Sequence, residues 1–126
     1  MARVVVLIAE LMFASRVQEA LASGGHEVAL VAHEDDARAQ APDADVFVVD
    51  LADESLDGAT LVESMLMGRE LGSTRSLGIY AHTDSETRLR AQQAGLDLVV
   101  PRSRMVREGP ELVTALALGD PRPGSL

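Results

Sequence analysis

Five short apolar runs rich in β-branched residues alternate along this chain with stretches of helical periodicity. We predict strands over residues 3–9, 26–32, 45–50, 76–81 and 96–100. We predict helices over residues 11–23, 33–40, 59–71, 84–95 and 105–118, the last beginning at 110 if Gly109 and Pro110 interrupt it. Strands that alternate with helices are typical of a parallel sheet covered by helices on both faces. The sequence therefore predicts a doubly wound α/β fold.

The length of 126 residues and the absence of repeats or linkers indicate a single domain. We expect this domain to occupy residues 1–118 and to be followed by a flexible tail over residues 119–126. The first 15 residues loosely resemble a secretory signal, but Glu10 interrupts the apolar run, which favours a core strand. No apolar stretch is long enough for a membrane span, so we expect no membrane contact.

Composition excludes several classes of function. The net charge of −9 repels phosphate backbones, so we expect no binding to nucleic acid. Cysteine is absent, which excludes disulfides and thiolate metal sites and fits a cytoplasmic protein. Aromatic residues are only 2% of the chain, too few to sandwich a flavin. Neither a nucleophile elbow nor a phosphate-binding glycine loop occurs, so we expect no enzymatic activity.

Charged residues lie at the ends of three predicted strands. Glu10 follows the first strand, Asp50 ends the third and Arg102 follows the fifth. The carboxyl ends of parallel strands share one edge of a sheet, where ligands bind in such folds. Two carboxylates suit Mg²⁺, and a nearby cation suits a phosphoryl group. Each residue also has a plainer interpretation: Glu10 at the start of a helix, Asp50 in a turn, and Arg102 in solvent or an ion pair.

The loop after Asp50 carries a family resemblance. Asp57 and Gly58 follow Asp50 by seven and eight positions, and residues 81–97 end in Ala-Gly-Leu-Asp. Both features resemble response-regulator receiver domains, the phosphoacceptor half of two-component signalling, and the resemblance spans nearly the whole chain. It implies a flavodoxin-like, doubly wound five-stranded parallel sheet with strand order 2-1-3-4-5 in a single domain.

The resemblance also implies roles for individual residues. Asp50 would be the phosphoacceptor, and Mg²⁺ would be held by Glu10, Asp50 and the backbone carbonyl of Ala52. Tyr80, Ala81 and Arg102 would occupy the phosphate-site and switch positions.

The chain departs from the family pattern at four of its functional positions. Ala9 stands where receivers have a second acid, and Tyr80 stands where they have Ser or Thr. Arg102 replaces the usual Lys, and Val99 replaces the aromatic switch residue. The loss of one carboxylate predicts weak Mg²⁺ binding, because each unit charge contributes strongly to the affinity of such a site. Tyr80 and Val99 together predict that the coupled hydroxyl–aromatic switch is absent.

Three functions remain open from the sequence. The first is an atypical stand-alone receiver in a phosphorelay, which acts by protein–protein interaction and accepts phosphate at Asp50. Its partners would be a histidine kinase or phosphotransfer protein and a protein target. The alternative is a pseudo-receiver, an interaction module that does not depend on phosphorylation. A flavodoxin-like small-ligand binder is the least favoured. The face built from residues 84–118 is a candidate for partner binding and for a homodimer.

Overall fold

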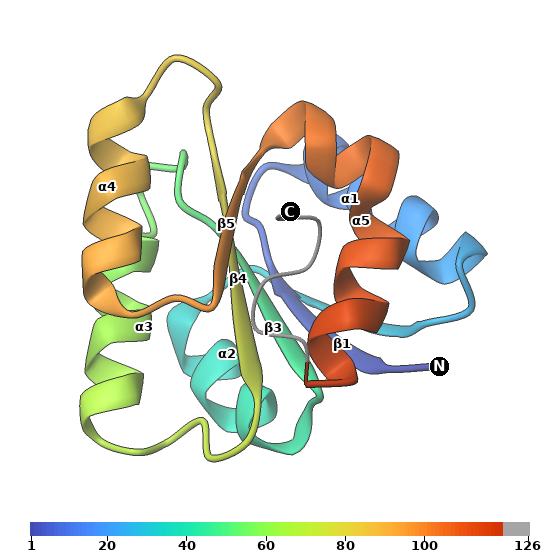
Figure 1. Cartoon of the computed structure of the whole chain (residues 1–126), viewed down its shortest axis with the longest axis horizontal. Helices are drawn as coiled ribbons and strands as arrows, with labels where there is room; N and C mark the ends of the chain where they lie inside the picture. Colours follow the sequence, from blue (N-terminus) through green and yellow to red (C-terminus); the bar gives the residue numbers. More distant parts are fainter. Residues whose placement is uncertain (120–126) are drawn as a thin grey trace.

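The computed structural model of this protein describes residues 1–119 and contains one five-stranded parallel sheet (Figure 1). The strands are β1 (Arg3–Leu7), β2 (Glu27–Val31), β3 (Val46–Asp50), β4 (Arg75–Tyr80) and β5 (Leu98–Pro101). Their order across the sheet is β2-β1-β3-β4-β5, and every neighbouring pair is parallel. The predicted fold class and strand order are therefore confirmed.

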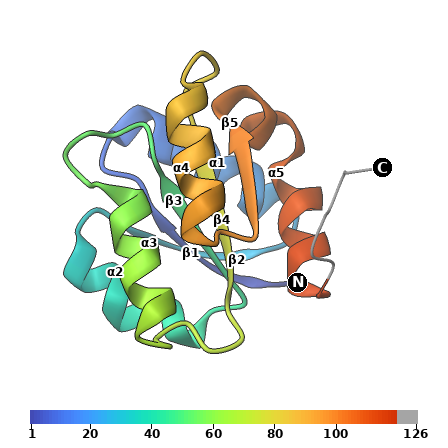
Figure 2. The same ribbon diagram turned by 60° about the vertical axis from the view of Figure 1, so that its left-hand side comes forward.

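Helices cover both faces of the sheet. The elements are α1 (Leu11–Ser23), α2 (Glu34–Gln40), α3 (Gly58–Met67), α4 (Ser85–Ala94) and α5 (Arg102–Ala117), with a 3₁₀ turn over Ala41–Asp43. One face packs against α1 and α5, and the other against α2, α3 and α4 (Figure 1). Figure 2 shows β5 at the edge of the sheet, beside α4 and α5.

The central strands are apolar on both sides because each of their faces lies under helices. In β3, Val46 and Val48 join the core under α1 and α5, whereas Phe47 and Val49 join the core under α2, α3 and α4. This alternation leaves no solvated position within the strand. Polar side chains are consequently confined to the strand ends, and Asp50 is the residue at which β3 stops being apolar.

The last helix begins earlier than the sequence indicated. α5 starts at Arg102 rather than at residue 105 or 110, and it continues through Pro110. A proline inside a helix usually interrupts it, at about 3 kcal/mol or more. Here a tertiary contact holds it in place, because the Pro110 carbonyl accepts a hydrogen bond from His26 Nε2 at 3.0 Å. Within the helix, the same carbonyl accepts from the Thr114 hydroxyl at 2.9 Å.

Three other boundaries differ from the predicted ones by two residues or more. α3 ends at Met67, not at residue 71, because Gly68 caps it and Arg69 takes a left-handed φ of 56°. β1 ends at Leu7 and β5 begins at Leu98, each two residues inside its predicted limit. From residue 120 onward, the predicted tail lies outside the described part of the chain. No helix within residues 1–119 has the length and hydropathy needed to cross a bilayer.

We expect Gly24→Ala to destabilise the protein by about 1–3 kcal/mol, because the added methyl group overfills a packed contact. A Cβ at Gly24 would lie 2.5 Å from the Cβ of Pro110, between α1 and α5. Gly68→Ala is the matched control, since both glycines cap helices with nearly the same backbone angles. A Cβ at Gly68 would meet only the flexible Glu70 side chain and a backbone oxygen at 3.3 Å or more. Urea unfolding of both variants measures the difference, and equal stabilities would contradict the tight contact.

Candidate functional site

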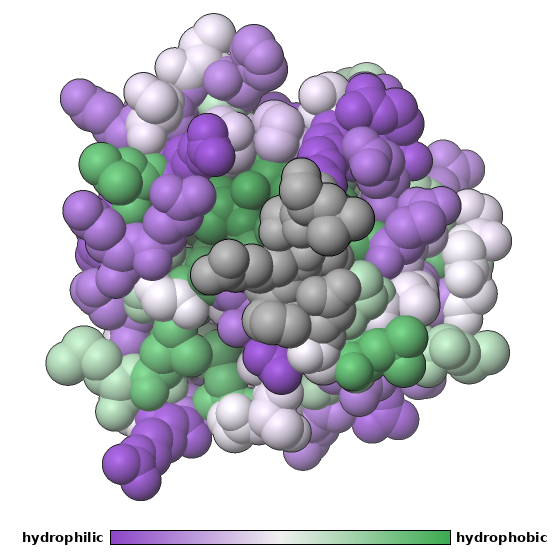
Figure 3. Space-filling model, viewed as in Figure 1, coloured by the Kyte–Doolittle hydropathy of each residue, from purple (hydrophilic) through white to green (hydrophobic). Residues whose placement is uncertain are grey.

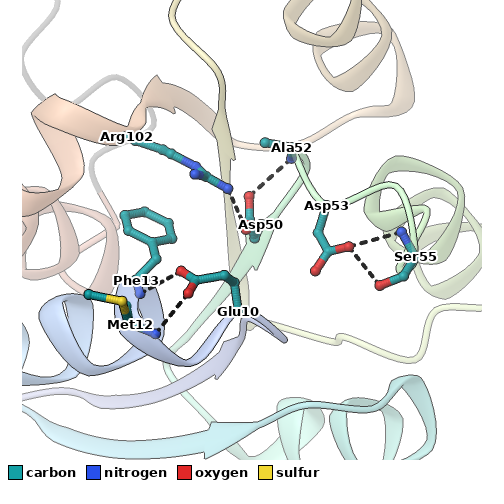
Figure 4. A network of polar contacts seen from close by, with 8 residues as sticks. All are labelled: Glu10, Met12, Phe13, Asp50, Ala52, Asp53, Ser55 and Arg102. Carbon is teal, nitrogen blue, oxygen red and sulfur yellow. Dashed lines mark hydrogen bonds and ion pairs between the residues drawn. The ribbon is translucent and has the colours of Figure 1, made fainter.

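Asp50 lies at the carboxyl edge of the sheet and is completely buried. Both of its carboxylate oxygens are engaged (Figure 4). Oδ1 accepts the backbone N–H of Ala52 at 3.0 Å, which closes the turn after the strand, and Oδ2 accepts from Arg102 Nη2 at 3.2 Å. Each oxygen thus accepts one hydrogen bond, and Arg102 places a positive charge against Oδ2 in the arrangement that the structure shows.

Arg102 reaches Asp50 from the first residue of α5. Its guanidinium carbon lies 4.6 Å from the centre of the Phe13 ring, which comes from α1 and holds the guanidinium by a cation–π contact (Figure 4). Its Nε is buried without a hydrogen-bond acceptor among residues 1–119, although the side chain as a whole is 42% exposed. Arg102 is thus the link between the buried carboxylate and the surface.

Glu10, the second predicted metal ligand, caps the first helix. Its carboxylate accepts the backbone N–H groups of Met12 at 3.0 Å and Phe13 at 2.7 Å. These N–H groups have no partner within the helix, so the carboxylate satisfies them and also favours the positive end of the helix dipole. This geometry agrees with the simpler interpretation of the sequence, in which Glu10 lies at the start of a helix.

Burial raises the pKa of the Asp50 carboxyl above its ordinary value. The Ala52 N–H and the positive charge of Arg102 lower the pKa again, but only in part. The nearby Asp53 carboxylate raises it further. Asp53 itself accepts hydrogen bonds from the Ser55 hydroxyl and backbone N–H, which lower the pKa of Asp53. The folded protein therefore contains a desolvated Asp50 carboxylate, and Arg102 compensates for the cost of its negative charge only in part.

Tyr80 ends β4, next to Asp50, and is buried with 9% of its surface exposed. Asp50 is in register with Ile79, so Tyr80 lies one residue further along. Side-chain alternation places Tyr80 on the same face as Gly78, which packs on the α3 and α4 side, whereas Asp50 faces α1 and α5. No hydrogen bond joins the Tyr80 hydroxyl to Asp50 in the described structure, and Val99 in β5 is half-buried without a ring to move.

Ala81 and Ala52 contribute only backbone groups to this edge. The Ala81 carbonyl accepts the N–H of Asp84 at 2.8 Å, in the turn that precedes α4. Ala52 donates its N–H to Asp50. The structure therefore brings Asp50, Arg102 and Ala52 into direct contact, whereas no hydrogen bond links Tyr80, Ala81 or Glu10 to that group in the described residues.

The residues present fit Mg²⁺ poorly. A magnesium site normally uses one or two carboxylates and several waters. Here Glu10 is bound by a helix terminus, and the Arg102 guanidinium lies against Asp50 where a cation would bind. Among residues 1–119, no cluster of three or more His, Cys, Asp or Glu side chains is arranged to hold a metal.

Phe13 is the site residue that the sequence analysis missed. It lies three positions after Glu10 and is one of only two phenylalanines in the chain. Its spacing from Val17 and Leu21 indicated nothing beyond the core-facing side of α1. Only the arrival of Arg102 from the far end of the sequence gives its ring a second role, and no local pattern reports that contact.

Comparison with solved structures identifies receiver domains as similar folds. The signal receiver domain of a NarL response regulator from Mycobacterium tuberculosis is 26% identical, with a TM-score of 0.78 over 94% of this chain and 97% of that one. The chemotaxis response regulator CheY4 of Vibrio cholerae is 21% identical, with a TM-score of 0.73 over 90% and 98%. No family model matches the sequence. No curated protein matches it.

A third neighbour bears on the metal. The receiver domain of the sensor histidine kinase PA1611 from Pseudomonas aeruginosa, which has magnesium coordinated in its active-site cleft, is 17% identical, with a TM-score of 0.80 over 94% of this chain and 98% of that one. These three structural neighbours are thus receiver domains, two of them from response regulators, and they match nearly the whole chain. This chain has the receiver fold, a fold that suggests response-regulator signalling.

We expect Asp50→Asn to raise the free energy of unfolding at pH 7 by on the order of 1 kcal/mol, because it removes a buried charge. The pKa of Asp50 is higher in the folded protein than in the unfolded chain, so the carboxyl stabilises the fold fully below its ordinary pKa. That stability is lost as the pH rises through the raised pKa. The advantage of the variant should therefore shrink as the pH falls toward about 4.

Chemical denaturation across this pH range measures the effect. Asp53→Asn is the control with the opposite sign, because the pKa of Asp53 is lowered in the folded state. Its carboxylate stabilises the fold above the ordinary pKa, and this stability is lost as the pH falls. A wild-type protein more stable than Asp50→Asn at pH 7 would show that the Arg102 ion pair outweighs the burial of the charge.

Proposed function

We propose that this protein is an atypical receiver that works as a non-enzymatic protein-interaction module in a signalling system, with binding that depends little on phosphorylation of Asp50. The Asp50–Arg102 ion pair carries this proposal. In this pair, Arg102 reaches the buried carboxylate from an adjacent helix and supplies its counter-charge. A phosphoacceptor instead needs a free carboxylate oxygen, and a switch needs a second state that a partner distinguishes.

The position of Tyr80 also supports the proposal. A hydroxyl switch must move toward the phosphoryl group, whereas Tyr80 lies on the opposite face of the sheet from Asp50 and is held in the packed interior. Val99 offers no aromatic ring that could follow such a movement. Phosphorylation, if it occurred, would therefore lack the two side chains that usually carry the signal to the surface.

Phosphoacceptance at Asp50 remains the second candidate function. The carboxylate ends β3 at the sheet edge, and Asp57 and Gly58 follow at the receiver spacing. The magnesium-bound receiver domain among the structural neighbours favours the same chemistry at an equivalent edge. In this case a histidine kinase or phosphotransfer protein would supply the phosphoryl group, and Arg102 would have to leave Asp50 before transfer.

The face formed by α4, β5 and α5 is the surface we propose for a protein target or for a homodimer. Leu89 on α4 is 55% exposed, and Leu98 and Val99 on the edge strand are half-buried. Figure 2 shows these three elements side by side. Exposed apolar residues beside an edge strand are a common basis for association.

We expect self-association, and the retention of any partner recovered with the protein, to change less than about tenfold between wild type, Asp50→Asn and protein treated with beryllofluoride. Tenfold corresponds to about 1.4 kcal/mol. Analytical ultracentrifugation and quantitative pull-down measure these affinities. A larger change would falsify the phosphorylation-independent function and favour the second candidate. Intact-mass measurement after treatment with acetyl phosphate reports separately whether Asp50 accepts phosphate.

A surface substitution locates the face. Leu89→Arg should weaken the association because it replaces the exposed leucine of α4, beside the edge strand, by a charge. Met67→Arg is the matched control, since Met67 is 81% exposed at the end of α3 and lies outside the proposed face. Equal effects of the two variants would mean that association does not use this surface.

Magnesium binding should be weak in the wild type and tighter by about tenfold in Ala9→Asp, which adds a carboxylate at the edge of the sheet where Asp50 lies. Ala9 follows the end of β1 by two residues, immediately precedes Glu10 and is half-buried, which places it at the same edge of the sheet. A magnesium titration followed by amide NMR shifts at the ends of β1 and β3 measures the affinity. No change in Ala9→Asp would mean that position 9 does not face the site.

A further inference from the structure

A hollow of about 500 Å³ opens between the first turns of α1 and α5, on the solvent side of Arg102. Its polar wall consists of Glu10, Arg16, Arg102, Ser103 and Arg107, and its apolar wall includes Met12 and Val106. The volume lies within the range of about 300–1,000 Å³ that is usual for small-molecule sites. The hollow is therefore large enough for a small-molecule ligand, and it has one polar wall and one apolar wall.

The hollow is positive in a protein that is strongly negative. The chain has a net charge of −9 and its 11 basic residues are all arginines, and three of them meet here. Arg16 makes no ion pair within residues 1–119, and Arg107 pairs only with the exposed, adjacent Glu108 in that range. The acid in the wall, Glu10, already accepts two backbone N–H groups. Figure 3 shows strongly hydrophilic residues gathered over the first turns of α5.

Arg102 connects this hollow to the buried carboxylate. One edge of its guanidinium meets Asp50, but its Nε has no acceptor in the described structure. A buried N–H without an acceptor is unfavourable, so the inward position leaves Arg102 incompletely satisfied. Because 42% of the side chain is exposed, it can turn toward the hollow without disrupting the core. The first turn of α5 adds N–H groups that no side chain caps.

We propose that this hollow binds a phosphorylated small molecule and that the bound phosphate draws Arg102 away from Asp50. Guanidinium groups match phosphate oxygens in paired hydrogen bonds, and Arg16, Arg102 and Arg107 surround one space. The Ser103 hydroxyl supplies a further donor. Met12 and Val106 offer an apolar surface for the organic part of the ligand. This binding goes beyond the proposed interaction function, and the hollow shares Arg102 with Asp50.

Competition for Arg102 couples the hollow to Asp50. The Asp50 carboxylate and the ligand phosphate both attract the same guanidinium, so weakening one interaction strengthens the other. The coupling is reciprocal, and a bound ligand would leave Asp50 with the Ala52 N–H as its remaining polar contact of those described. If the hollow were only a patch of positive surface charge, its affinity for the ligand would not depend on the completely buried Asp50.

The test is isothermal titration of the full chain with AMP, inorganic phosphate and adenosine, without added magnesium and at low salt. We expect AMP to bind about tenfold more tightly than inorganic phosphate, and adenosine not to bind, because the phosphate anchors the ligand and the apolar wall adds affinity. Amide NMR shifts on AMP addition should centre on Met12, Ser103 and Val106. Tighter binding of a glutamate-rich peptide than of AMP would overturn the proposal and identify a protein-docking surface.

Substitutions separate this site from general charge effects. Arg16→Gln and Arg107→Gln should each weaken AMP binding by about tenfold, which is the loss of one charge-assisted contact. Arg69→Gln removes the same charge from an exposed position after α3 and should have no effect. Asp50→Asn should tighten AMP binding at least about threefold by releasing Arg102. Equal losses in all three arginine variants, or unchanged affinity in Asp50→Asn, would overturn the proposal.

Discussion

Burial of both faces of a parallel sheet is the constraint on which the rest of this structure depends. It requires β1 and β3 to be apolar between their ends, and it confines charged side chains to the strand ends. The right-handed crossovers bring those ends to one edge, where α1 and α5 also begin. The edge consequently gathers Glu10, Asp50 and Arg102, which are far apart in the sequence.

The electrostatics of the site depend on how the charge of the buried Asp50 carboxylate is balanced. Asp50 is completely buried, so its charge needs a partner, and Arg102 provides one from the first turn of α5. The position of Arg102 depends on how α5 packs, and the close contact between Gly24 and Pro110 sets the distance from α1. A packing contact in the middle of α5 thereby helps to determine the electrostatics at its first residue.

The helix ends that were predicted well from the sequence are those set by residues next to them in the chain. Asp84 and Gly95 bound α4 because one side chain caps its start and the other residue takes a left-handed φ of 101° at its end. The start of α5 was predicted wrongly because Pro110 breaks isolated helices, whereas here His26 and Gly24 accommodate it. Both come from elsewhere in the chain, so no window around Pro110 contains them.

The sequence by itself determined the layered α/β fold, since the alternation of strand and helix periods specifies which faces must be buried. It also placed Asp50 and Arg102 at one edge, because strand ends coincide in any parallel sheet. Only the tertiary structure decided that Asp50 and Arg102 form an ion pair, with the guanidinium packed over the Phe13 ring. It also decided that Glu10 caps a helix. The reason is physical: hydrogen bonds and ion pairs depend on distances of a few ångströms between side chains, and those distances arise only when the helices have packed on the sheet.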